Sequence, residues 1–132
     1  MSASPTTKKR SLKQWQSTVD AVLTDVEQWC VQAGWLVHSS ELSIDEDSTG
    51  TYKTRQLQIK TPIDHLFVQP IGRDIVAADG RIDIYAWPSL YRAILILHGK
   101  KWVLLDDFGK KWPTPWSRET FIDVAQKLTS AK

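Results

Sequence analysis

Two apolar runs on either side of a short polar break constrain the fold of this chain more than any other feature. Residues 93–97 and 102–105 are apolar, and Gly99 and Lys100 lie in the break between them. A two-residue turn with glycine at its first central position is typical of a tight β-hairpin. In the register that this turn sets, each apolar residue of one run faces an apolar residue of the other. A slip of one residue would break the match, so the sequence predicts a hairpin here.

This predicted hairpin is apolar on both faces, because successive side chains of a strand point to opposite sides. One face carries Leu95, Leu97, Trp102 and Leu104, and the other carries Ile94, Ile96, Val103 and Leu105. Apolar faces need cover. Two predicted helices would cover one face, and the second would be covered by loops and tryptophans or by a partner, for which a homodimer is one arrangement.

A long helix is predicted over residues 12–33, where apolar side chains recur at spacings of three and four. Ser11 is its expected N-cap and Gly34 its expected C-cap. The lone cysteine, Cys30, lies on the apolar stripe and is expected to be a small buried hydrophobe.

A shorter helix is predicted from Ser117 to about residue 130. Trp116 and Phe121 occupy the positions of a hydrophobic staple at its start. Strands are expected over 35–44, 52–60 and 65–71, where apolar and polar residues alternate or turn residues end the run.

A second tight hairpin is predicted between a strand over 74–78 and a strand over 81–87. Asp79 and Gly80 join them, and Asp-Gly is the strongest short turn signal of the chain. The order of all these elements predicts an α+β fold: a long N-terminal helix, a mostly antiparallel sheet of about five to seven strands with two tight hairpins, and a short C-terminal helix.

The organisation expected from composition is a flexible basic tail over 1–10 and a single domain over 11–132. The longest apolar runs fall well short of the roughly 20 residues of a membrane-spanning helix, so no membrane association is expected. One cysteine permits no internal disulfide, which fits a cytoplasmic location. The net charge of +2 does not by itself indicate a nucleic-acid-binding protein.

A short repeat gives the first candidate site, because the Gly-Lys-Lys-Trp of residues 99–102 recurs at 109–112. Lysines attract phosphate and aromatic rings stack on bases, so the two loops could bind nucleic acid. The tryptophans could equally form an apolar surface for a protein partner, and turn lysines are often no more than solvated. The candidate binding residues are Lys100, Lys101, Lys110, Lys111, Trp112 and Trp116.

A second candidate site begins at Asp83, which precedes a strand that ends in His98-Gly99-Lys100. This spacing resembles the PD-(D/E)XK nuclease superfamily, in which carboxylates and a lysine bind Mg²⁺ and orient the attacking water. The resemblance implies Asp83 as the first carboxylate, Lys100 as the lysine and Glu27 as an additional acid. His98 stands where the family has its second carboxylate, so the resemblance implies a degenerate, inactive member.

Asp74 and Asp83 share one face of the predicted second hairpin, with Asp83 opposite Val76. Two carboxylates on one face could hold Mg²⁺ weakly. Alternatively, either aspartate pairs with Arg73 or Arg81, or only keeps this face soluble. We expect this simpler account, with no strong Mg²⁺ site and no metal-dependent cleavage, because imidazole at His98 is a poor Mg²⁺ ligand.

No set of catalytic residues, metal ligands or cofactor-binding motifs stands out elsewhere in this tryptophan-rich sequence. We therefore expect a small non-enzymatic binding domain without a cofactor or a metal. Its expected partner is a protein, including a second copy of itself. The alternatives are a nucleic-acid-binding module that uses the Lys/Trp loops and a degenerate PD-(D/E)XK nuclease-like protein.

Overall fold

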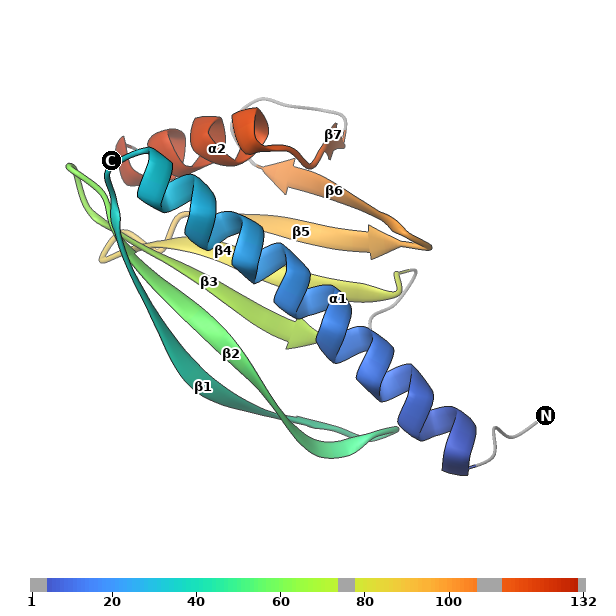
Figure 1. The fold of residues 1–132 in the computed structure, drawn as a ribbon. Coiled ribbons are helices and arrows are strands. Elements are labelled where there is room, and N and C mark those ends of the chain that lie inside the picture. Colours follow the sequence, from blue (N-terminus) through green and yellow to red (C-terminus); the bar gives the residue numbers. More distant parts are fainter. Residues whose placement is uncertain (1–4, 74–77, 107–112, 131–132) are drawn as a thin grey trace.

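The computed structural model describes residues 5–73, 78–106 and 113–130, with side chains from residue 12 onward. A long helix precedes a seven-stranded antiparallel sheet and a short helix follows it (Figure 1), which confirms the predicted α+β fold. The elements are α1 (Pro5–Gln32), β1 (Leu36–Glu46), β2 (Gly50–Lys60), β3 (His65–Gly72), β4 (Gly80–Trp87), β5 (Arg92–His98), β6 (Lys101–Asp106), β7 (Thr114–Pro115) and α2 (Arg118–Ser130). Neither helix, over its described residues, is long and apolar enough to cross a membrane.

Each strand of the sheet pairs with its neighbour in sequence, in the order β1 to β7. The predicted central hairpin is confirmed as β5 and β6. Leu97 lies opposite Trp102 and Leu95 opposite Leu104, in the register that the apolar match requires. Gly99 forms the turn with a φ of 62°, a left-handed conformation that glycine adopts without steric cost.

The predicted second hairpin is wrong. β4 pairs with β3 along one edge and with β5 along the other. Along the β3 edge, Asp83 lies opposite Gln69 and Tyr85 lies opposite Phe67. The strand expected over 74–78 falls largely on residues 74–77, which lie outside the described residues. β3 supplies a better match for β4, because both strands place buried apolar side chains on one face and polar or aromatic ones on the other.

Both helices lie on the same face of the sheet, which we call the inner face (Figure 1). The apolar stripe of α1 is buried against it, including Val19, Leu23 and Val26 at 0–1 % exposure. The helix begins at Pro5, inside the stretch predicted to be a tail, so Ser11 lies within the helix and is not its N-cap. The predicted C-cap is confirmed at Gly34, whose φ is 80°.

The start of α2 follows the sequence prediction. The Ser117 hydroxyl accepts a hydrogen bond from the backbone N–H of Thr120 at 3.2 Å, as an N-cap does. The rings of Trp116 and Phe121 lie 5.7 Å apart, which confirms the hydrophobic staple. Phe121 also contacts the rings of Trp29 and Trp35, so an aromatic cluster joins α2 to α1.

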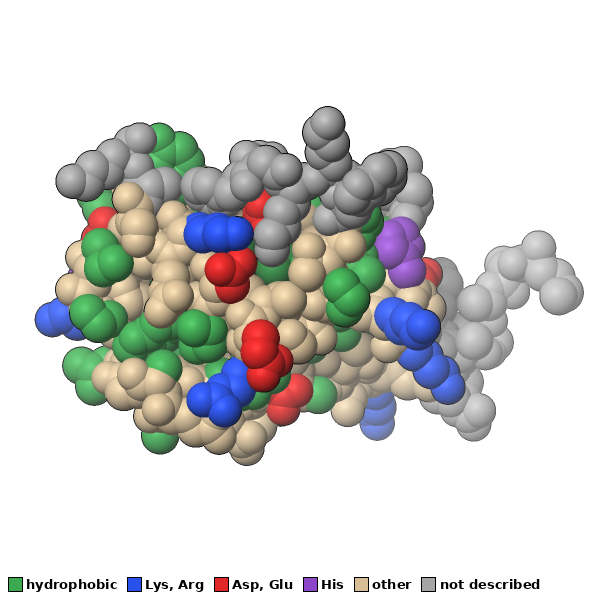
Figure 2. Space-filling view, turned by 90° about the horizontal axis from the view of Figure 1, so that it is seen from above, with side chains coloured by type: hydrophobic (Ala, Val, Ile, Leu, Met, Phe, Trp, Pro, Cys, Tyr) green, Lys and Arg blue, Asp and Glu red, His purple; other side chains and the backbone are tan. Residues whose placement is uncertain are grey.

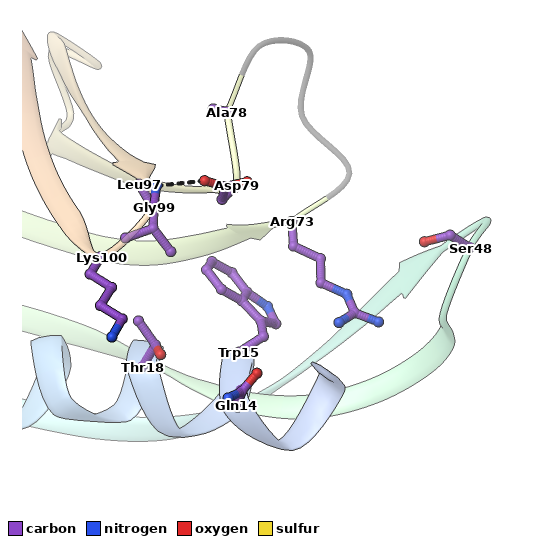
Figure 3. A pocket seen from close by; sticks show the side chains of 10 residues that line it. All are labelled: Gln14, Trp15, Thr18, Ser48, Arg73, Ala78, Asp79, Leu97, Gly99 and Lys100. Carbon is purple, nitrogen blue, oxygen red and sulfur yellow. Dashed lines mark hydrogen bonds between the residues drawn. The ribbon is translucent and has the colours of Figure 1, made fainter. Parts of the chain in front are cut away.

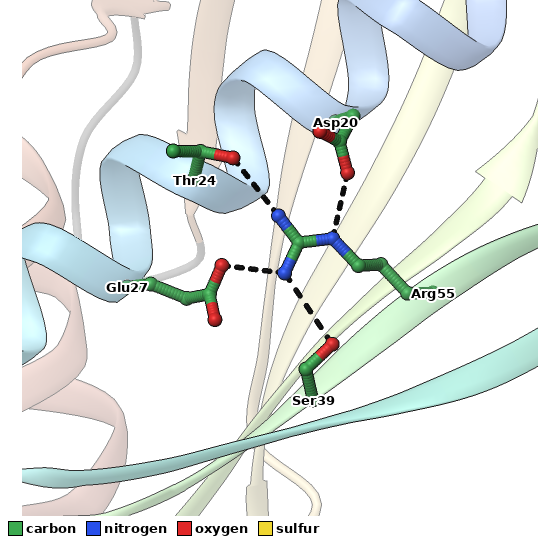
Figure 4. Close-up of polar contacts among 5 residues, drawn as sticks. All are labelled: Asp20, Thr24, Glu27, Ser39 and Arg55. Carbon is green, nitrogen blue, oxygen red and sulfur yellow. Dashed lines mark hydrogen bonds and ion pairs between the residues drawn. The ribbon is translucent and has the colours of Figure 1, made fainter.

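Arg55 on β2 links α1 to the β1–β2 hairpin through several hydrogen bonds (Figure 4). The guanidinium of Arg55 on β2 donates to Asp20 at 2.7 Å, to Thr24 at 2.9 Å and to Glu27 at 2.5 Å. These three acceptors lie three and four residues apart, so they share one side of α1. A longer bond of 3.3 Å reaches Ser39 on β1. This arrangement orients the helix on the sheet. It also engages the Glu27 carboxylate in an ion pair with Arg55.

The opposite, outer face of the sheet is covered by none of the described helices. Its side chains instead pack on one another along the rows of facing residues. Phe67 stacks on Tyr85 with ring centroids 5.1 Å apart, and the Arg92 guanidinium lies 5.3 Å from the centre of the Tyr85 ring. Ile94 and Leu105 face each other in the next row and remain half-buried. The second apolar face of the central hairpin thus obtains part of its cover from within the sheet.

The side chain of Cys30 is 0 % exposed, in agreement with its expected role as a small buried hydrophobe. Burial, reinforced by the nearby charge of Glu27, raises the pKa of this thiol from 9.0 to about 12. The folded state therefore keeps the proton that the unfolded state releases near pH 9. The stabilisation is complete below pH 9 and is lost as the pH rises toward 12.

We expect the free energy of unfolding to fall by up to about 1.4 kcal/mol per pH unit in this range through Cys30 alone. Urea unfolding at a series of alkaline pH values measures the slope, and Cys30→Ala should reduce it. Because Cys30 is buried, we also expect thiol reagents to modify it only as fast as the native protein unfolds, locally or globally. Equal alkaline slopes in the two proteins would contradict this account.

Candidate functional site

Two of the four lysines of the predicted Lys/Trp loops, Lys100 and Lys101, lie at the tip of the β5–β6 hairpin. Lys100 and Lys101 are exposed beside His98, and Figure 2 shows a histidine and basic side chains toward the right-hand end of the view. Trp116 is half-buried in the aromatic cluster, and its indole N–H has no acceptor among the described residues. Lys110, Lys111 and Trp112 lie outside the described residues. Nucleic-acid binding through these loops stays a prediction.

A cleft of about 710 Å³ lies between α1 and the tip of the β5–β6 hairpin (Figure 3). Trp15 projects from α1 into its middle, with Arg73 on one side and Lys100 and Thr18 on the other. The Trp15 ring packs against Gly80, where a larger residue would have no room, because an added Cβ would lie 2.2 Å from the ring.

Two charged side chains of this cleft, Arg73 and Asp79, are engaged within the protein. The Arg73 guanidinium donates to the Thr49 hydroxyl at 2.6 Å, and Asp79 accepts the backbone N–H of Gly99 at 2.6 Å. The described lining contains neither histidine nor cysteine, so it supplies neither an imidazole nor a thiol. These contacts hold the ends of the strands together and favour a structural role for the cleft.

Asp83, the first carboxylate of the nuclease-like pattern, lies on the outer face in an ion-pair cluster. Arg81 Nε is 2.6 Å from one carboxylate oxygen and Arg92 Nη1 is 2.5 Å from the other. The hydrogen bond to Asp83 raises the pKa of Arg81, against the opposing effect of burial. Asp83 is 1 % exposed beneath the two guanidinium groups. Both of its oxygens are thus engaged by cations. Arg81 is one of the two arginines considered from the sequence, whereas Arg92 was not considered and Arg73 instead binds Thr49. Asp74 lies outside the described residues.

The structure does not bring the nuclease-like residues together. Asp83 lies on the outer face, while Glu27 belongs to α1 on the inner side and binds Arg55. Lys100 lies in the β5–β6 turn. Over the described ranges, no group of three or more His, Cys, Asp or Glu side chains could hold a metal ion.

The exposed large apolar side chains gather at one end of the sheet, which we call the apolar end. They come from the end of α1, the start of β1 and the β2–β3 and β4–β5 turns, and their exposure runs from 40 to 70 %. Among the described side chains, Ile71 alone of this class lies elsewhere. Hydrophobic side chains are accordingly more frequent toward the left of Figure 2, the side on which these turns lie in Figure 1. The residues of the apolar end are Val31, Leu36, Ile63, Trp87, Leu90 and Tyr91.

The β4–β5 turn presents three of these residues in a fixed geometry. Ala86 N–H donates to the Tyr91 carbonyl at 2.9 Å, and Leu90 N–H donates to the Ala86 carbonyl at 3.0 Å. Leu90 has a φ of 68°, a left-handed conformation that is rare for a leucine. The turn therefore holds an apolar side chain in water at a conformational cost, which is a feature found at binding sites.

The apolar end was not predicted from the sequence. Its signal is that Ile63 and Trp87 lie next to Pro62 and Pro88 and that Leu90 lies two residues after Pro88, since turn positions near proline face solvent and are normally polar. Large apolar residues at such positions have no place in the core of the domain.

Comparison of the chain with protein-family models, with curated proteins and with solved structures found no match in any of the three.

Proposed function

We propose that this protein is a small non-enzymatic binding domain that engages a protein partner through the apolar end. The observation that carries the proposal is the concentration of exposed large apolar side chains at one end of the sheet, where each of the six is at least 40 % exposed. Exposed apolar surface of this kind is typical of protein–protein interfaces, and tryptophan and tyrosine are enriched at the centres of such interfaces.

The conformation of Leu90 supports the same conclusion. A glycine at this position would adopt a φ of 68° without steric cost, yet the chain has a leucine that is 53 % exposed. We expect Leu90→Gly to leave the free energy of unfolding nearly unchanged, because relief of about 1–2 kcal/mol of left-handed strain offsets the entropic cost of glycine and the loss of the half-buried leucine surface. The leucine side chain then adds little to stability at this position.

The experiment places a photo-crosslinking phenylalanine analogue at Trp87 in cells that naturally contain the protein. We expect one predominant protein adduct, which weakens when Leu90→Gly is added although the stability of that variant is nearly unchanged. The matched control carries the analogue at Lys53, an exposed strand residue away from the apolar end. The same adducts from both positions, or adducts unaffected by Leu90→Gly, would refute the proposal.

A further inference from the structure

The two edges of the sheet differ in how they are protected against the addition of another strand. The β7 edge has two residues, and Pro115 is one of them. Short edge strands and proline are common devices that prevent pairing between molecules. The β1 edge has eleven residues and contains no proline, lysine or arginine. Of its three acidic residues, Asp45 and Glu46 lie at its end, and Glu41 forms an ion pair with Lys53.

The β1 strand is also regular and accessible. It pairs with β2 from Leu36 to Glu46 without a bulge, and in the described part of the chain β2 is its one strand neighbour. Ile44 is the one buried residue of β1, and Leu36 is 70 % exposed. The outward-facing backbone N–H and C=O groups of such an edge form a ready template for another strand.

We propose that this edge joins two copies of the chain, with β1 paired antiparallel to β1 of the second copy about a two-fold axis at Ser40. Antiparallel pairing of a strand with itself is isologous, so the same residues serve both copies and the assembly closes as a dimer. The pairing would join the two sheets into one continuous sheet.

The side chains favour this register over one centred on Glu41. With Ser40 on the axis, Leu36 lies opposite Ile44 of the second copy and His38 lies opposite Leu42. Leu36 is 70 % exposed and thereby gains an apolar neighbour, whereas Ile44 is itself only 8 % exposed, so the pair buries mainly Leu36. An axis at Glu41 would instead place two carboxylates directly opposite each other, which is destabilising.

The first experiment tests the axis by charge. Ser40→Lys places two ammonium groups opposite each other and should raise the dissociation constant of the dimer by about tenfold or more, measured by sedimentation. Ser40→Glu should do the same. An equimolar mixture of the two variants should recover the dimer, because lysine then faces glutamate. Ser43→Glu is the control for charge, since this exposed residue faces Lys53 within its own sheet and would face Val37 of the second copy.

The second experiment uses Ser40→Cys under mild oxidation. Residues on a two-fold axis lie within the Cα separation of about 6 Å that a disulfide spans, so a covalent dimer should form. The matched variant Ser43→Cys should not cross-link, because its two copies would lie about 20 Å apart along the strands. Cys30 is buried and does not compete in the native protein.

A wild-type protein that stays monomeric at all accessible concentrations would overturn the proposal. So would a dimer that tolerates Ser40→Lys and forms no Ser40→Cys disulfide. Because these variants leave Trp87 and Leu90 intact, the outcome is independent of the crosslinking test of the apolar end.

Discussion

Replacing Phe121 by alanine should lower the free energy of unfolding by about 3–5 kcal/mol, the range for truncating a fully buried phenylalanine. Phe121 is 0 % exposed, and its ring lies 5.7 Å from the rings of both Trp29 and Trp116. Truncation opens a cavity where α2 meets α1, and aromatic neighbours of this size cannot collapse into it. Thermal unfolding should shift down by about 10 °C or more.

Phe67→Ala is the matched control, because Phe67 is half-buried on the outer face and stacks on the Tyr85 ring alone among the described aromatic rings. We expect it to cost about 1–2 kcal/mol, measured by the same denaturant titration. Equal losses in the two variants would show that the aromatic cluster is not the main tie between the helices.

The second large effect is expected for Asp83→Ala, which should lower the free energy of unfolding by about 2–4 kcal/mol. Removing the carboxylate leaves Arg81 and Arg92 side by side without the charge that they share. The loss should fall below that of a fully buried pair, because the two arginine side chains are 30 % and 46 % exposed and can reach water.

Glu41→Ala provides the comparison for Asp83. Glu41 forms an ion pair with Lys53 at 3.1 Å, but both side chains are at least 66 % exposed, so the loss should stay below about 1 kcal/mol. Denaturant titration of both variants measures the difference. A folded Asp83→Ala variant of unchanged stability that loses a metal-dependent nuclease activity of the wild type would instead support the nuclease-like alternative.

The parts of the fold that were predicted correctly depend on local sequence. The β5–β6 hairpin was specified by its turn and by apolar residues on both sides of it, and the start of α2 by Ser117 with the staple of Trp116 and Phe121. The second hairpin failed although its Asp-Gly turn was the strongest local signal. The partner of β4 was decided by the match of two faces with β3, which no local signal reports.

The candidate sites likewise differ in whether their residues are close in sequence or are brought together only by the fold. Arg81 could be assigned to Asp83 from the sequence because it is two residues away, whereas Arg92 comes from the neighbouring strand and depends on the β4–β5 register. The residues of the apolar end are distant in sequence. They lie at one end of the sheet because the paired strands between them have similar lengths.

The sequential strand order has a consequence for how the chain acquires its structure. Each hairpin can form as soon as its own residues are available, because its contacts are local and its loop-closure cost is small. The aromatic cluster between the first and last helices cannot form until α2 has been synthesised. A chain still on the ribosome therefore keeps part of the inner face unburied to the end, and a truncation before α2 would leave an assembled sheet that exposes its core to aggregation.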